Sequence, residues 1–102
     1  MKLIQCLSDK IEDEIEDANA YIDLAVKWKQ EYPDTADLFY ELSVEEMGHM
    51  GKLHDEVVEL IDEYRKEKGE PPKEMMFVYD YLHKRHIEKA SQVKGKQALY
   101  KA

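Results

Sequence analysis

Apolar residues recur every three or four positions along most of the chain, with polar residues between them. This spacing is typical of amphipathic helices, and it predicts three of them, over residues 9–31, 34–68 and 73–93. No stretch alternates strictly between apolar and polar residues, as a half-buried strand would. We therefore predict an all-α protein: a single domain over residues 1–102, with an antiparallel helical hairpin, a third helix and a basic C-terminal tail over 94–102.

Two short breaks separate the predicted helices. The first is Tyr32-Pro33-Asp34, and the second is Lys68-Gly69-Glu70-Pro71-Pro72. Proline cannot continue a helix, and glycine readily adopts the left-handed conformation that often ends one. The middle helix would be about 50 Å long at 1.5 Å per residue, so we expect part of it to pack on another chain. The candidate N-terminal caps are Asp9 with Glu12, and Asp34 or Thr35.

Composition excludes several classes of protein. With 43% hydrophobic and 37% charged residues, the chain of 102 residues is too apolar for a disordered acidic tail. It has no apolar run that could span a bilayer, and no segment that resembles a signal peptide. The net charge of −8 argues against nucleic acid as a partner and is compatible with cation binding. The single Cys6 cannot form an internal disulfide, so we expect a reducing, cytoplasmic location.

The charge is unevenly distributed along the chain. Residues 73–102 contain seven basic and three acidic residues, a net charge of +4, which leaves −12 on the first 72 residues. The basic end could dock on the acidic body or on a neighbouring copy. Two solvated surfaces of opposite sign are an equally good interpretation.

A few polar residues fall where the apolar face of a helix should be. At about 100° per residue, Glu46 projects roughly 15° and His49 roughly 45° from the centre of the second helix's apolar face. Among the many acids of the first helix, Glu14 projects closest to its apolar face, roughly 60° from the centre. A buried carboxylate without a partner costs several kcal/mol, so such a group must be neutral, paired or bound to a metal.

The Glu46-x-x-His49 spacing has a physical rationale as half of a metal site. Residues at i and i+3 share a helical face, so a carboxylate oxygen and an imidazole nitrogen can converge on one ion. A hydrogen-bonded polar pair across a helical interface is the alternative. His86 lies near the centre of the third helix's apolar stripe; it is either a core histidine with a hydrogen-bond partner or a residue that binds or supports a metal. His54 and His83 project to exposed positions.

The residues over 11–65 resemble the first helical hairpin of the ferritin and rubrerythrin superfamily. The resemblance rests on Glu14, followed seven residues later by Tyr21, and on Glu46-x-x-His49 in the antiparallel second helix. It implies that Glu14 and His49 are metal ligands, that Glu46 bridges two irons, and that Tyr21 is a nearby hydrogen-bonding aromatic.

The chain also departs from that superfamily. A complete member carries two such hairpins around one di-iron centre, whereas this chain has one set of ligands and no Cys-x-x-Cys pair. Two copies related by a two-fold axis would supply the complete set, as in the short encapsulated ferritins, which this chain resembles most. We therefore expect a homo-oligomer, at least a dimer that forms a four-helix bundle. No C-terminal docking peptide for an encapsulin shell is visible, which argues against residence in a shell.

The resemblance implies a di-iron protein that handles iron or oxidises Fe²⁺ with O₂ or peroxide, with Glu14, Glu46 and His49 as the catalytic and metal-binding residues. Carboxylate and imidazole donors suit iron, and manganese is possible. One alternative is a non-enzymatic helical oligomerisation or adaptor module, so the assignment as an enzyme stays open. Another is a peroxide reductase like rubrerythrin, which the absence of electron-transfer cysteines disfavours.

Overall fold

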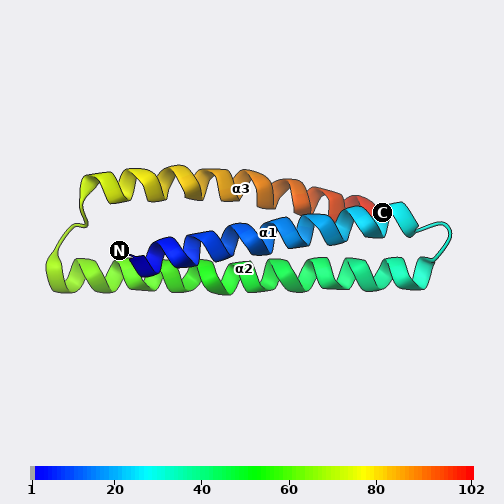
Figure 1. Cartoon of the computed structure of the whole chain (residues 1–102), viewed down its shortest axis with the longest axis horizontal. Coiled ribbons are helices and arrows are strands. Elements are labelled where there is room, and N and C mark those ends of the chain that lie inside the picture. Colours follow the sequence, from blue (N-terminus) through cyan, green and yellow to red (C-terminus); the bar gives the residue numbers. More distant parts are fainter. Residues whose placement is uncertain (1) are drawn as a thin grey trace.

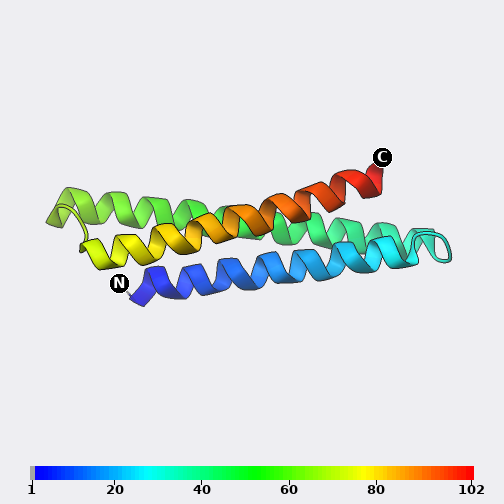
Figure 2. The same cartoon turned by 90° about the horizontal axis from the view of Figure 1, so that it is seen from above.

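The computed structural model describes residues 2–102, which form three α-helices joined by two short connections. The helices are α1 (Lys2–Trp28), α2 (Pro33–Lys68) and α3 (Lys73–Lys101). α1 and α2 form an antiparallel hairpin, and α3 lies obliquely over it as a second layer (Figures 1 and 2). The molecule is a rod of 56 × 20 × 18 Å. The prediction of an all-α protein with a hairpin and a third helix is confirmed.

The ends of α2 agree closely with the sequence pattern. Pro33 occupies the first turn, where its missing N–H costs nothing. Gly69 has a φ of 81° and donates its N–H to the carbonyl oxygen of Arg65, so it ends the helix in the left-handed region, as predicted. The cap prediction was wrong, because Tyr32 is the N-cap residue and makes no side-chain cap hydrogen bond.

α1 begins seven residues before the predicted start and ends three residues before the predicted end. Asp9 and Glu12 therefore lie inside the helix and cap nothing. The apolar face simply continues toward the N-terminus, where Ile4 is only 4% exposed and Ser8 is buried as well. An acidic pair inside an acidic helix has the same pattern as a capping pair. Burial of the preceding turn stabilises the helix there, so the helix begins earlier than this pattern predicts.

The segment predicted as a basic tail is instead the end of α3, which continues to Lys101. It docks on the acidic body of the same chain. Lys96 Nζ donates hydrogen bonds to Asn19 Oδ1 at 2.8 Å and to Asp23 Oδ1 at 2.9 Å. The buried Tyr100 donates its hydroxyl hydrogen to Asp37 Oδ1 at 2.6 Å. The uneven charge of the sequence thus corresponds to attraction between α3 and the hairpin.

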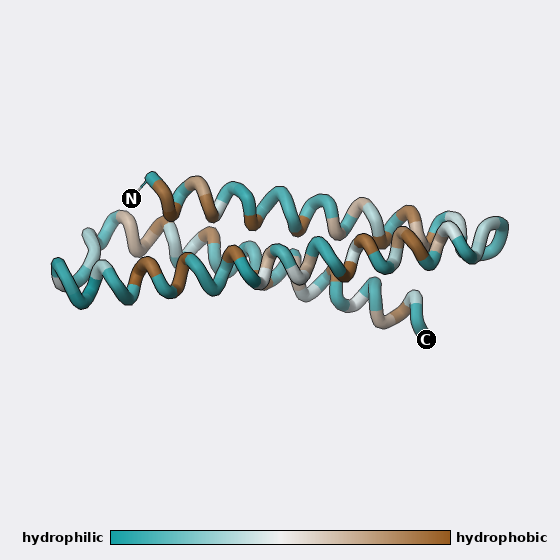
Figure 3. Tube along the Cα trace, turned by 90° about the horizontal axis from the view of Figure 1, so that it is seen from below, coloured by the Kyte–Doolittle hydropathy of each residue, from teal (hydrophilic) through white to brown (hydrophobic). Residues whose placement is uncertain are grey.

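Ser43 lies where the three helices meet. It is fully buried; its hydroxyl donates to the carbonyl oxygen of Ala18 on α1 at 2.7 Å and accepts a hydrogen bond from Gln97 Nε2 on α3 at 2.9 Å. Elsewhere α1 packs along α2, whereas α3 rests mainly on α1 and touches α2 little. Figure 3 shows apolar and polar turns alternating along the helices, as expected for faces that pack against one another.

None of the three helices within residues 2–102 has the length and apolar character needed to cross a membrane.

Candidate metal centre

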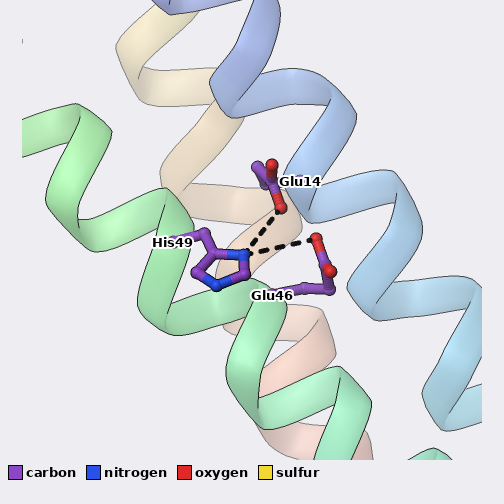
Figure 4. Close-up of side chains that lie close together, drawn as sticks. All are labelled: Glu14, Glu46 and His49. Carbon is purple, nitrogen blue, oxygen red and sulfur yellow. Dashed lines mark ion pairs between the residues drawn. The ribbon is translucent and has the colours of Figure 1, made fainter.

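Glu14 of α1 and Glu46 and His49 of α2 lie together in the middle of the hairpin (Figure 4). One ligand atom from each residue lies within 4.8 Å of the other two. His49 Nδ1 is 3.5 Å from Glu14 Oε2 and 3.9 Å from Glu46 Oε2. In the described part of the chain, this is the one group of three or more such side chains that could hold a metal ion.

The antiparallel register of α1 and α2 brings these side chains together. The hydrogen bond from Ser43 to the carbonyl of Ala18 joins the two helices at this point of the register. Glu14 lies four residues before Ala18, and Glu46 lies three residues after Ser43, so both are about one turn from the bond and on the same side of it. His49 follows Glu46 by three residues, which places the two on one face of α2.

The carboxylates are largely buried, whereas the imidazole is open to solvent. The side chains of Glu14 and Glu46 are 23% and 21% exposed, and that of His49 is 55% exposed. Glu14 Oε2 is buried without a hydrogen-bond partner. A buried carboxylate oxygen without a donor is costly in a folded protein, and a bound cation is one way to satisfy it.

The pKa of Glu46, the second carboxylate of the group, is raised by its surroundings. Sharing of a proton with Glu14, together with burial and the negative charge of Glu14, raises the pKa of Glu46 to about 7, while His49 opposes the shift. Two carboxylates that face each other in a partly desolvated place cannot both ionise easily. At pH 7, Glu46 of the metal-free group is therefore protonated in about half of the chains, and a divalent cation would displace that proton.

The group opens on the side of the hairpin that α3 does not cover. In Figure 4 the three side chains lie between α1 and α2, with α3 behind them. Leu42 and Leu53 share the face of α2 that carries Glu46 and His49, and both are only partly buried.

Two other residues named from the sequence lie outside the group. Tyr21 stacks on Phe39 with ring centroids 6.4 Å apart, and no hydrogen bond joins it to either carboxylate within residues 2–102. His86 is buried, as its place in the apolar stripe predicted, but its Nε2 donates to Glu12 Oε2 at 2.9 Å. Glu12 is two residues from Glu14 and therefore points to another side of α1.

Glu12 instead joins α1 to α3. Besides the bond from His86, its carboxylate accepts a hydrogen bond from Lys89 Nζ. These hydrogen bonds, first that of Lys89, hold the pKa of Glu12 below its usual value in spite of burial. The sequence pattern indicated Glu12 only as part of an N-terminal cap. It did not predict that α3 would cover this side of α1.

The prediction that His54 and His83 are exposed was wrong. Their rings stack across the α2–α3 gap with centroids 4.8 Å apart, and both residues are partly buried. A signal was present in the sequence, because His83 precedes the apolar-stripe residue His86 by three positions and so shares its side of α3.

The sequence matches the rubrerythrin family over residues 5–100, nearly its whole length. The chain belongs to the rubrerythrin family. Domains of this family bind iron, and the carboxylate and histidine group formed by Glu14, Glu46 and His49 is a possible metal site. A search of curated proteins and a search of solved structures each gave no match. The sequence contains one Glu-x-x-His motif, Glu46-x-x-His49.

Proposed function

We propose that two copies of this chain pack through the open face of the α1–α2 hairpin and complete a di-iron centre that oxidises Fe²⁺. One chain supplies two glutamates and one histidine, whereas a di-iron site of this superfamily uses four glutamates and two histidines. A two-fold axis through the open face would supply the missing half from identical residues.

The observation that carries this proposal is the unsatisfied oxygen of Glu14. Glu14 Oε2 is buried without a hydrogen bond. It faces the imidazole of His49 and the carboxyl group of Glu46, whose pKa is raised to about 7. A cation held between Glu14, Glu46 and His49 would satisfy this oxygen. Oxygen donors with one imidazole suit Fe²⁺ or Mn²⁺ better than a softer ion.

The three residues would divide the work as their positions allow. Glu14 and His49 would each act as a ligand to iron. Glu46 would lose its proton and would bridge two irons. When bound, the irons would supply one-electron redox chemistry and open positions for O₂ or peroxide. Leu42 and Leu53, which are partly buried on the same face, would limit access of water once a second copy covers them.

Two rival functions make different use of the same face. A non-enzymatic oligomerisation module would form the dimer but bind no iron at the three residues. A peroxide reductase would need a route for electrons, and the chain contains a single, exposed cysteine, Cys6. Iron oxidation requires only the centre itself, so it is the function that the available residues support best.

Anaerobic titration with Fe²⁺ tests the proposal. We expect about one iron per chain, saturating as two per dimer, followed by rapid oxidation of the bound iron when O₂ is admitted. The Glu46→Ala/His49→Ala variant should lose both properties. Glu45→Ala is the matched control, because Glu45 is an exposed neighbour on the same helix, and it should keep both.

Sedimentation measurements on the same samples separate the rivals. An unchanged iron stoichiometry in the double variant would refute the metal site. A dimer that binds no iron would support the oligomerisation module, and iron bound by a monomeric chain would refute the shared centre.

A further inference from the structure

Three histidines lie together on the side of the hairpin that α3 covers. α2 and α3 border a cavity of about 590 Å³ there, with Ile11 of α1 among its lining residues. None of the residues of the candidate iron centre lines it. Three of the four histidines of the chain do, and they are His54, His83 and His86.

Two of these histidines contact each other across the cavity. The rings of His54 on α2 and His83 on α3 are stacked at 4.8 Å with an angle of 19° between their planes. Tyr79 stacks on His83 at 5.7 Å. His86 is less free to bind another partner, because its Nε2 is hydrogen-bonded to Glu12.

Carboxylates flank the histidine pair. Asp55 Oδ1 lies 3.9 Å from His54 Nδ1, and the side chain of Asp55 is 88% exposed, so it is free to move. Asp80 lies one turn before His83 on α3, and its negative charge acts to raise the pKa of His83. Burial, followed by the neighbouring His54 and His86, lowers the pKa of His83, which favours the neutral imidazole at neutral pH. Neutral imidazole is the form that binds metal ions.

We propose that His54 and His83 form a second metal site, for a divalent transition-metal ion of the kind that prefers imidazole, such as Zn²⁺. Asp55 and Asp80 supply further oxygen ligands or hold the coordinating water. Two neutral imidazoles and two carboxylates balance the charge of one divalent ion. Both helices contribute a ligand, so the ion joins α2 to α3 where the two helices otherwise touch little.

Binding of an ion requires the two rings to leave their stacked arrangement. Two nitrogens bound at about 2.05 Å to a tetrahedral zinc ion lie about 3.3 Å apart. The ring centroids are 4.8 Å apart and the ring planes differ by 19°, so the helices already hold the two histidines at a suitable separation. At least one ring must rotate about its side-chain bonds so that a nitrogen of each ring faces the same ion. Within residues 2–102, three ligand atoms already lie within 4.8 Å of one another only at Glu14, Glu46 and His49. A third ligand at the histidine pair therefore comes from rotation of an aspartate side chain.

This proposal stands apart from the iron centre, and its test uses a chain in which that centre is removed. In the full-length Glu46→Ala/His49→Ala variant, the remaining histidines are His54, His83 and His86. Zn²⁺ is added at pH 7.5, and the imidazole nitrogens are followed by long-range ¹H–¹⁵N NMR, with calorimetry for the stoichiometry. We expect the ring signals of His54 and His83 to shift together and to saturate near one Zn²⁺ per chain.

His86 is the internal control, because its bond to Glu12 should leave its signals unchanged. In the same background, His54→Gln/His83→Gln should abolish this binding, and Asp55→Asn should weaken it about tenfold. Glu88→Gln, an exposed substitution on α3, should leave it unchanged. Zinc that shifts neither His54 nor His83, or that shifts only one of them, would overturn the proposal, and so would undiminished binding by the double glutamine variant. The NMR result on the parent variant decides the question even if a further substitution prevents folding.

Discussion

The proton held by the two glutamates gives the sharpest test of the electrostatics of the candidate iron centre. Glu14 is the largest cause of the raised pKa of Glu46, both through a shared proton and through its charge. Glu14→Gln removes that negative charge and keeps the shape of the side chain. We expect the pKa of Glu46 to fall from about 7 toward the ordinary value of 4.5.

The change is large enough to measure directly. With a pKa of about 7, roughly nine-tenths of the metal-free chains carry a proton on Glu46 at pH 6, against about 3% with a pKa of 4.5. Carboxyl ¹³C NMR from pH 3 to pH 9, with a chelator present, follows this proton. Asp17→Asn is the matched control, since Asp17 also lies on α1 but makes the smallest contribution to the raised pKa, and its loss should shift the midpoint only slightly.

The same proton links pH to stability. Between about pH 4.5 and pH 7 the folded metal-free chain holds more protons than the unfolded chain, so its free energy of unfolding should decrease as pH rises through this window. Glu14→Gln should flatten this part of the curve. A wild-type midpoint near 4.5, or a midpoint near 7 that survives Glu14→Gln, would refute the reasoning.

Three further predictions concern the packing that holds the site in place, all measured by chemical denaturation. Ser43→Ala removes the buried hydrogen bond to the carbonyl oxygen of Ala18 and the acceptor of the partly buried amide of Gln97, and it should cost about 1–3 kcal/mol. The exposed Ser91→Ala should change little, and equal effects would contradict the junction role. Tyr100→Phe removes the bond to an exposed carboxylate and should cost about 1 kcal/mol, with no loss of helix content by circular dichroism. Ile22→Ala creates a cavity at a fully buried position and should cost about 2–5 kcal/mol; a cost below 1 kcal/mol would mean that the hairpin is loosely packed there.

The sequence contains enough information to predict the helices and the metal-binding residues of the hairpin. The period of the apolar residues fixes helix rather than strand, and Pro33 and Gly69 mark the ends of α2 closely. Glu46 and His49 are three residues apart on one helix, so their proximity is a local property of helical geometry. Glu14 projected toward the hairpin interface because it flanks the apolar stripe of α1, and the structure places it beside the other two.

The ends of α1 and α3 were less predictable. Nothing in the local sequence outweighed the acidic residues near Asp9 or the lysines after Val93, and both segments are helical because their apolar residues are buried against other helices. Ile4 and Tyr100, each 4% exposed, are examples. Packing stabilises such turns more than the intrinsic preferences of their residues do.

The sequence by itself thus determined the local properties: three amphipathic helices, the hairpin, and one Glu and one Glu-x-x-His on facing stripes. Only the tertiary structure decided which of the remaining polar residues meet. Glu12 and His86 are 74 residues apart and His54 and His83 are 29 apart, and each pair meets because α3 lies obliquely over the α1–α2 hairpin (Figure 2). The path of a third helix depends on packing over the whole length of the molecule, which periodicity within one helix does not encode.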